Sequence, residues 1–270
     1  MIELNESEVR RIRVSIVECV GDICAQRGLD VLPAFSTLLG AVRHEDFVPW
    51  LVSAEICLPR PHYDELLTCF DEEARVRGLN YRVIRPFTQD YPSHSAYIED
   101  ADTAIAERGE NPRGVGVSVF PIDGLGEDLD RARFRAREIK LLCLAYKVKT
   151  VDKSFALREK SALTRLIIRL YAEFVPSEYI SAKVESLCRK TPYGDSKYVG
   201  IPASLHGEKT VFERPSYEKG EVKNFSTAKV VLPAAYDEIL TALYGEYMLF
   251  PPLAERTGRE FKAYKKEPKE

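Results

Sequence analysis

The acidic side chain with the clearest chemical potential is Glu55, which lies in the apolar run LVSAEICL at residues 51–58. This run predicts a β-strand, and residues two apart on a strand share a face. Glu55 therefore shares a face with Ser53, while the opposite face is apolar. A carboxylate so placed could bind Mg²⁺ if further acids or phosphate oxygens joined it. The alternative is a solvated acid or an ion pair with Arg60.

Other patterns of catalytic or metal-binding residues are missing from the sequence. His62, His94 and His206 have no ligand spacing with a Cys or Asp pair, so we do not expect them to bind zinc. The six cysteines are scattered, which is typical of reduced thiols in the core of an intracellular protein. The glycines form neither a Walker loop nor a dinucleotide fingerprint, and no Ser-His-Asp order is suggested.

The composition describes a folded chain of ordinary charge. It has 270 residues, 39 Lys and Arg against 42 Asp and Glu, and is 45% hydrophobic. This predicts one large globular domain or two modest ones. A net charge of −3 gives no electrostatic footprint for nucleic acid or an anionic membrane. The charged N-terminus does not look like a secretory signal, and the apolar runs are too short for a membrane span. We therefore expect a cytoplasmic protein.

Helices and strands alternate along the chain and would position these residues. Hydrophobic periodicity and end signals predict helices over 6–28, 36–44, 61–78, 127–149, 155–190 with a break near Pro176, and 233–245. Short β-rich runs predict strands at 29–35, 51–58, several within 80–125, and at 197–201, 209–213 and 228–232. We expect Ser36 or Thr37 to cap the second helix. The fold class is α+β, or mixed α/β, with a helical second half.

A long segment of the chain resembles a known family. The run STLLGAVRHEDFVPWLVSAEICLPRPHY at 36–63 resembles the signature segment of the LicD-type phosphotransferases. Resemblance continues in the same order at VFPIDGL (119–125), KYVG (197–200) and LTALYGEYM (240–248), followed by Pro251 and Pro252. The match thus spans nearly the whole chain.

The resemblance implies a fold and an activity. The fold is a nucleotidyltransferase-like mixed sheet flanked by helices. We expect its core over 1–125, with a helical and loop-rich part over 126–270 packed on it as one continuous unit. Enzymes of this family transfer phosphocholine, or a similar phospho-alcohol, from a nucleotide-activated donor such as CDP-choline to a glycan of lipopolysaccharide or teichoic acid. The family reaction uses Mg²⁺, which neutralises and orients the transferring phosphoryl group.

By resemblance, substrate binding falls on a short segment. Its residues are Ser36, Thr37, Gly40, Arg43 and His44. Small residues before a helix let backbone N–H groups approach a phosphate closely. Arg43 and His44 could cradle a phosphate or the nucleotide of the donor. The alternative for Arg43 is a surface ion pair with Glu45 or Asp46.

The chain departs from the family where the family has its acids. After the Pro-Trp pair, the aspartates of the family are replaced by Leu51, Val52, Ser53 and Glu55, and a third acid on a later strand falls at Ser118. A small pair before the second helix has become Phe35-Ser36, where the ring of Phe35 would hinder a phosphate. Further departures fall at Asp46, at Tyr97 and at Thr257-Gly258-Arg259. Serine hydroxyls are weak ligands for Mg²⁺, so we expect Glu55 to be a relic of the catalytic and metal site, with Ser53 and Ser118 at the positions of the lost acids.

Two hypotheses follow from these departures. The first is a LicD-like scaffold that is catalytically impaired or inactive and for which we expect no cofactor. It predicts a well-folded protein that ignores Mg²⁺. The alternative is an active Mg²⁺-dependent phosphotransferase that uses Glu55 and an unidentified second acid. It predicts Mg²⁺-dependent turnover of the donor.

Overall fold

The chain divides into two compact units. The computed structural model describes residues 1–270 apart from 52, 89–90, 107–112, 160, 257–261 and 267–270. Unit 1 consists of Met1–Ile84, Ala96–Pro121 and Pro215–Glu270, and unit 2 consists of Arg85–Ser95 and Ile122–Arg214. The predicted α+β class is confirmed. Within the described residues, no helix has both the length and the apolar content needed to cross a bilayer.

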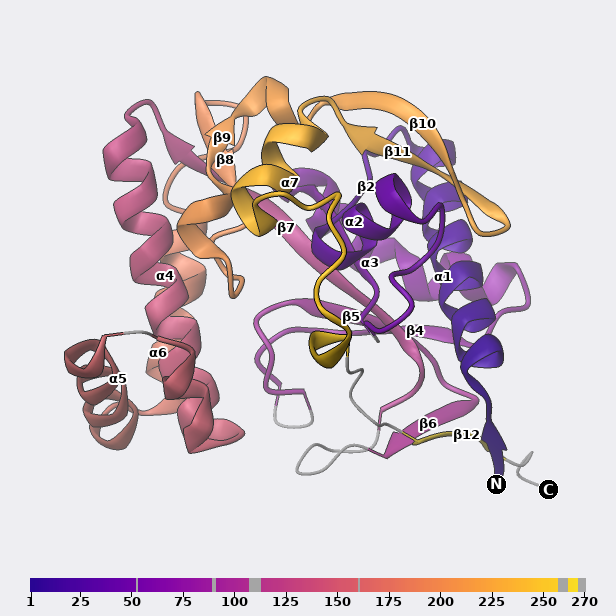
Figure 1. The fold of residues 1–270 in the computed structure, drawn as a ribbon, viewed down its shortest axis with the longest axis horizontal. Coiled ribbons are helices and arrows are strands. Elements are labelled where there is room, and N and C mark those ends of the chain that lie inside the picture. The colour runs from indigo at the N-terminus through magenta and orange to yellow at the C-terminus, as the bar shows by residue number, and fades with distance from the viewer. Residues whose placement is uncertain (52, 89–90, 107–112, 160, 257–261, 267–270) are drawn as a thin grey trace. The chain divides into compact units, whose positions relative to one another are not determined.

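A mixed sheet forms the centre of unit 1 (Figure 1). In spatial order its strands are β2 (Leu32–Pro33), β3 (Glu55–Pro59), β7 (Gly116–Gly126), β5 (Ala96–Asp100) and β4 (Tyr81–Ile84). The pairs β2–β3, β5–β7 and β4–β5 are antiparallel. Ile98, Val117 and Val119 are fully buried, because this sheet carries apolar side chains at its centre.

Four α-helices lie in the described part of unit 1. They are α1 (Glu6–Arg27), α2 (Phe35–Arg43), α3 (Arg60–Val76) and α7 (Tyr236–Tyr244). The first agrees with the prediction: Asn5 and Glu8 form a capping box, and Gly28 ends the helix with a φ of 69°. The expected cap of α2 is wrong, because Ala34 is its N-cap and the Ser36 and Thr37 hydroxyls bond elsewhere. The helix predicted over 233–245 begins three residues later, at Tyr236, because Pro233 is the last residue of a strand.

Two further sheets complete unit 1. A hairpin of β10 (Lys219–Phe225) and β11 (Ala228–Pro233) lies against β2 and α1, and β10 was not predicted. The strands β1 (Ile2–Leu4), β12 (Lys262–Lys265) and β6 (Thr103–Ala106) form a three-stranded antiparallel sheet. Near the C-terminus, the described residues therefore include a strand, β12, that pairs with both β1 and β6.

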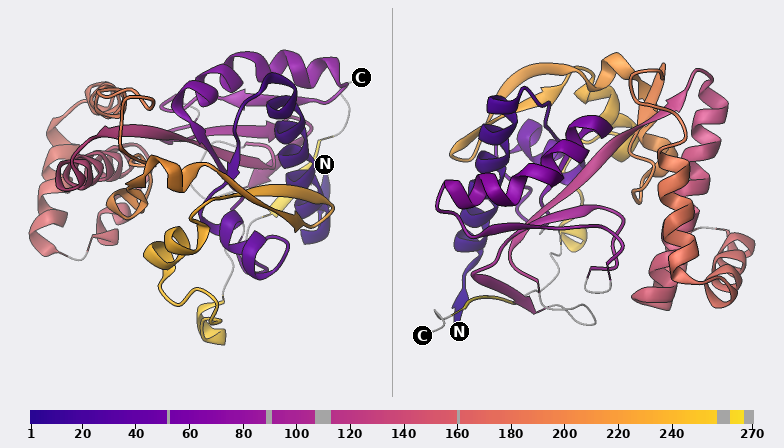
Figure 2. Two further views of the ribbon diagram at one scale, coloured as in Figure 1. Left: turned by 90° about the horizontal axis from the view of Figure 1, so that it is seen from above. Right: turned by 180° about the vertical axis from the view of Figure 1, so that it is seen from behind.

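Helices dominate unit 2. They are α4 (Leu129–Thr150), η1 (Lys153–Arg158), α5 (Ala162–Phe174) and α6 (Ser177–Cys188), and the short strands are β8 (Tyr198–Gly200) and β9 (Phe212–Glu213). The views in Figure 2 show α5 beside α4 and α6. The break near Pro176 is confirmed, since Pro176 is the N-cap of α6. A second break went unpredicted, because the Ser161 hydroxyl starts a new helix.

Candidate functional site

Glu55 is hydrogen-bonded to the first turn of α2. Its Oε2 accepts from the Ser36 backbone N–H at 2.9 Å and from the Ser36 hydroxyl at 2.6 Å. The Ser36 and Ser53 hydroxyl oxygens are 2.9 Å apart and share a hydrogen bond. The Glu55 N–H donates to the Thr37 hydroxyl at 2.8 Å. Four of the residues singled out from the sequence thus lie in one hydrogen-bonded cluster.

This arrangement satisfies the backbone amides at the start of α2 internally. A helix N-terminus attracts anions because its first N–H groups have no partner within the helix and its dipole is positive there. Here the Glu55 carboxyl accepts a hydrogen bond from the Ser36 N–H. The Ala34 carbonyl accepts one from the Thr37 N–H at 2.9 Å. The backbone amides of Ser36 and Thr37, two of the residues predicted for substrate binding, therefore already have partners.

Burial governs the charge of Glu55. It raises the pKa of the Glu55 carboxyl above its ordinary value, because the charged form is disfavoured away from water. Hydrogen bonds from Ser36 and Ser53, and the charge of Arg13, oppose part of this shift. The predicted alternative of an Arg60 pair is not what the structure has, since the Arg60 guanidinium lies 3.9 Å from Asp64.

The register of β7 places Ser118 beside the same segment. The Ser118 N–H donates at 2.8 Å to the carbonyl of Ala54, the residue between Ser53 and Glu55. On its other side, Ser118 pairs with Tyr97 of β5. The three positions at which the resemblance led us to expect acids in the family, 53, 55 and 118, therefore have neighbouring backbones. Val52 and residues 257–259, where we noted further departures, lie outside the described residues.

Phe35 and Gly40 have structural roles in α2. Phe35 has a φ of 44°, and its buried ring packs edge-on against Phe120 at 5.1 Å between centroids. The ring is thus part of the core. A Cβ at Gly40 would lie 2.3 Å from the backbone oxygen of Asp46, so glycine allows the loop after α2 to approach the helix.

Arg43, the last residue of α2, binds the C-terminal part of unit 1. Its Nη1 donates to the carbonyls of Tyr247 at 2.6 Å and Leu249 at 3.3 Å. Its guanidinium lies 5.5 Å from the Trp50 ring and 5.0 Å from the Phe250 ring. These distances are typical of cation–π contacts. The partner predicted in the alternative, Asp46, instead pairs with Arg10 at 3.2 Å.

A second arginine contacts the same two rings. The Arg256 guanidinium lies 5.2 Å from both Trp50 and Phe250. Burial and the charge of Arg256 lower the pKa of Arg43. Two neighbouring guanidiniums are a chemically reasonable environment for a phosphate group.

His44 lies within this aromatic cluster. Its ring centroid is 5.6 Å from those of Trp50 and Phe250, and its Nδ1 faces the Arg43 Nε at 3.5 Å. The buried Nε2 has no hydrogen-bond partner among the described residues. Burial and the charge of Arg43 lower the pKa of His44, so the ring is neutral at neutral pH.

Tyr244 connects the two halves of the site electrostatically. Burial raises the pKa of the Tyr244 phenol, and the nearby charge of Glu55 raises it further while that of Arg43 lowers it. The Ser36–Glu55 cluster and the Arg43–His44 cluster thus both influence one phenol. Sequence reasoning noted Tyr244 only as part of a family match.

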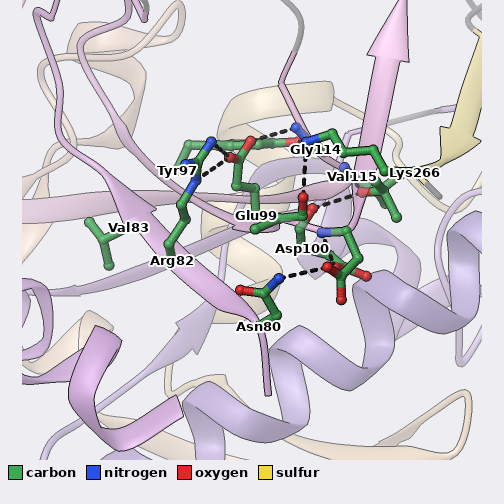
Figure 3. Close-up of polar contacts among 12 residues, drawn as sticks. Asn80, Arg82, Val83, Tyr97, Glu99, Asp100, Gly114, Val115 and Lys266 are labelled. Carbon is green, nitrogen blue, oxygen red and sulfur yellow. Dashed lines mark hydrogen bonds and ion pairs between the residues drawn. The ribbon is translucent and has the colours of Figure 1, made fainter. Parts of the chain in front are cut away.

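A second buried acid in the sheet serves the fold (Figure 3). Glu99 of β5 is fully buried, and its Oε1 accepts from the Arg82 Nε and lies 2.6 Å from Nη2. The Gly114 N–H also donates to the Glu99 carboxylate. The carboxylate is therefore paired and hydrogen-bonded, as buried charges must be. The sequence missed this pair because its two members come from different strands.

The residues at the cluster do not fit a magnesium site. Mg²⁺ prefers charged oxygen ligands in octahedral geometry. Here the Glu55 carboxyl has a raised pKa and hydrogen bonds to α2, and the other two positions are serines. Within the described part of the chain, no group of three or more His, Cys, Asp and Glu side chains could hold a metal ion.

A separate cavity of about 540 Å³ lies elsewhere in unit 1. It is lined by α1, β2 and the β10–β11 hairpin, and Ile56 on the opposite face of β3 also contributes. None of the residues predicted for substrate binding lines it.

Comparison with known proteins adds a relative to this geometry. No family model matches the chain. The chain is 21% identical over 257 residues to a lipopolysaccharide cholinephosphotransferase, LicD, of Haemophilus influenzae. The alignment covers 93% of this chain and 94% of that protein. Over nearly its whole length, the chain therefore resembles the LicD-type phosphotransferases.

Proposed function

We propose that this chain is a LicD-like protein whose Mg²⁺-dependent phosphotransfer is strongly impaired or lost. The ligands carried over by resemblance are a nucleotide-activated phospho-alcohol, such as CDP-choline, and a glycan acceptor. The observation that carries the proposal is the hydrogen bonding of Glu55 to the Ser36 amide and hydroxyl. The one acid left at the family's metal positions is used to satisfy the N-terminus of α2.

The chemistry of phosphoryl transfer explains why this would impair catalysis. A bound Mg²⁺ would neutralise charge on the transferring group and orient it for attack. Ser53 and Ser118 offer neutral hydroxyls at the positions of the missing acids, and the raised pKa of Glu55 weakens its remaining contribution. Serines also remove the repulsion among clustered carboxylates, so we expect the fold to gain stability where activity is lost.

The alternative, an active enzyme, requires a second acid near Glu55. Glu99 is the buried carboxylate one strand beyond Ser118, but it is paired with Arg82. Asp46, near the end of α2, is paired with Arg10. Releasing either acid for a metal would break its ion pair, and Glu99 would also lose the hydrogen bond from the Gly114 N–H, which favours the hypothesis of impaired transfer.

A comparison of three proteins tests the proposal. The first is the wild type. The second carries Ser53→Asp, Glu55→Asp and Ser118→Asp, and the matched control carries Ser53→Asn, Glu55→Gln and Ser118→Asn. Thermal unfolding with and without Mg²⁺, and hydrolysis or transfer from CDP-choline, would be measured for each.

We expect the wild type to show no Mg²⁺ dependence in either assay. The aspartate variant should be less stable than the wild type without the metal, because like charges repel. Mg²⁺ at a hundred times its Kd should then stabilise it by about 2.7 kcal/mol, and the control should not respond. Mg²⁺-dependent donor turnover by the wild type would refute the proposal. An aspartate variant that is neither destabilised nor rescued would show that the metal positions are misassigned.

A further inference from the structure

Helix α5 exposes most of its apolar side chains. Five large apolar residues of this 13-residue helix are between 50% and 79% exposed, namely Leu163, Leu166, Ile167, Leu170 and Phe174. With 3.6 residues per turn, these positions fall within an arc of about 100°. An apolar stripe of this width normally faces the core of a protein. In α5 it faces outward.

The opposite face holds α5 in unit 2. Ile168 and Ala172 are its buried residues, and they join an apolar cluster with residues of α4 and α6. The Lys149 Nζ at the end of α4 also donates to the Ala172 carbonyl at 2.9 Å. The helix is thus fixed by the face that carries Ile168 and Ala172, while its five exposed apolar side chains remain uncovered.

The segment of sequence that contains α5 is basic, although the whole chain is slightly acidic. Residues 147–173 contain seven Lys and Arg against three Asp and Glu. Of the acids, Glu159 pairs with Lys140 at 3.3 Å and Asp152 accepts from the Ser154 N–H, so Glu173 is the one acid not so engaged. Lys153 and Arg169 are exposed. Their charges therefore remain available to an external anion.

We propose that α5 lies flat on an anionic phospholipid surface, with its five apolar side chains in the headgroup–acyl boundary. Helices that bind membranes in this way combine an apolar stripe with a basic flank and do not span the bilayer. Lys and Arg beside such a stripe reach toward lipid phosphates while their aliphatic stems remain in apolar surroundings. The near-neutral total charge predicts no affinity for an anionic membrane, whereas this proposal rests on the local charge near α5.

The size of the face favours a lipid surface over a second copy of the chain. A helix of this length presents a face of roughly 20 by 10 Å, or on the order of 200 Å². A stable protein interface buries about 800 Å² on each partner. The face also consists mainly of Leu and Ile, whereas interface cores are enriched in aromatic residues, Met and Arg.

Vesicle flotation tests the proposal. The full-length protein would be mixed with vesicles of phosphatidylcholine alone, or of phosphatidylcholine with 30% phosphatidylglycerol. The test variant is Leu166→Glu with Ile167→Glu. The control, Phe134→Glu with Val222→Glu, adds the same charge at two exposed apolar positions outside α5. Circular dichroism melts check that both variants remain folded, which their exposed positions favour.

We expect the wild type and the control to float with the anionic vesicles and to be released by high salt. The α5 variant should partition at least about tenfold more weakly, because two large apolar side chains are lost from the bound face. Absence of flotation, equal binding to both vesicle types, or equal loss in the control would overturn the proposal. So would a wild-type dimer in sedimentation velocity that the α5 variant abolishes without any vesicle binding, since that result would assign the face to a second copy.

Discussion

Replacing Arg43 with alanine should weaken the attachment of the C-terminal segment to the end of α2. The substitution removes hydrogen bonds to the Tyr247 and Leu249 carbonyls and cation–π contacts with Trp50 and Phe250. Hydrogen bonds from a charged donor contribute about 1.5–3 kcal/mol each, and exposed cation–π contacts about 0.5–1 kcal/mol. The 3.3 Å bond is long, and loss of repulsion from Arg256 offsets part of the cost. We therefore expect the free energy of unfolding to fall by about 2–3 kcal/mol.

The protein carries its own probe of this cluster. Trp50 is the single tryptophan of the chain and contacts Arg43, His44 and Arg256. Its fluorescence should shift to the red in Arg43→Ala, because the C-terminal segment covers it less well. Urea unfolding, followed by fluorescence and by circular dichroism, would give the stability change. Arg75→Ala is the matched control, since that arginine is exposed and pairs with Glu72 on its own helix. We expect it to cost no more than about 0.5 kcal/mol.

A loss of stability in Arg43→Ala no larger than that of the control, with unchanged Trp50 emission, would refute this account of the cluster. A larger loss accompanied by unchanged emission would also contradict it, because the effect would then arise away from Trp50.

Two other predictions concern the backbone of α2 and the pH dependence of unit 2. Gly40→Ala should destabilise the protein by several kcal/mol, about 3 or more, because the new Cβ would clash with the Asp46 backbone oxygen. Gly21→Ala, where a Cβ meets nothing within 4 Å, should stabilise α1 by about 0.5–1 kcal/mol. A higher urea midpoint for Gly40→Ala than for Gly21→Ala would contradict this account of the packing. The pH prediction concerns His206. Burial lowers its pKa to about 4, so the unfolded state binds the proton first as pH falls from the ordinary value of 6.5. Stability is then complete above pH 6.5 and falls by about 1–2 kcal/mol by pH 5. His206→Gln should reduce the difference between urea midpoints at pH 7 and pH 5, and an unchanged difference would show that other groups cause it.

Local patterns in the sequence predicted the long helices well, but strand ends depended on distant partners. The periodic apolar residues and Gly28 predicted α1 nearly to its ends. The predicted strand over 51–58 begins only at Glu55, since its partner on one side, β2, is two residues long and pairs with Ile56 and Cys57. Alternation along one segment contains no information about the length of its neighbour. The strand β10 was not predicted for a similar reason. It is a strand because it pairs with β11, and its own sequence does not show that pairing.

The sequence predicted which residues lie together at the candidate site, but it did not predict the contacts among them. The family resemblance brought Ser36, Thr37, Ser53 and Glu55 into one segment of sequence, and they do lie together. The direction of the Glu55 side chain depends on its rotamer and on the approach of α2 to β3, which no local pattern specifies. The Arg43 contacts with Tyr247 and Leu249 join residues about 200 positions apart. Such contacts require the tertiary fold.

The hydrogen bonds of Glu55 also affect how a phosphate could bind at the N-terminus of α2. A phosphate that approached α2 would compete with Glu55 for the Ser36 N–H and would meet a carboxyl of the same charge. The raised pKa of Glu55 reduces this repulsion, since the neutral acid tolerates an adjacent anion better than the carboxylate does. An aspartate at this position would end one methylene short, and its carboxylate would reach the Ser36 amide less easily. Glutamate at this position therefore favours the hydrogen bonds to the N-terminus of α2, and the guanidiniums of Arg43 and Arg256 are two positive groups at the other end of that helix.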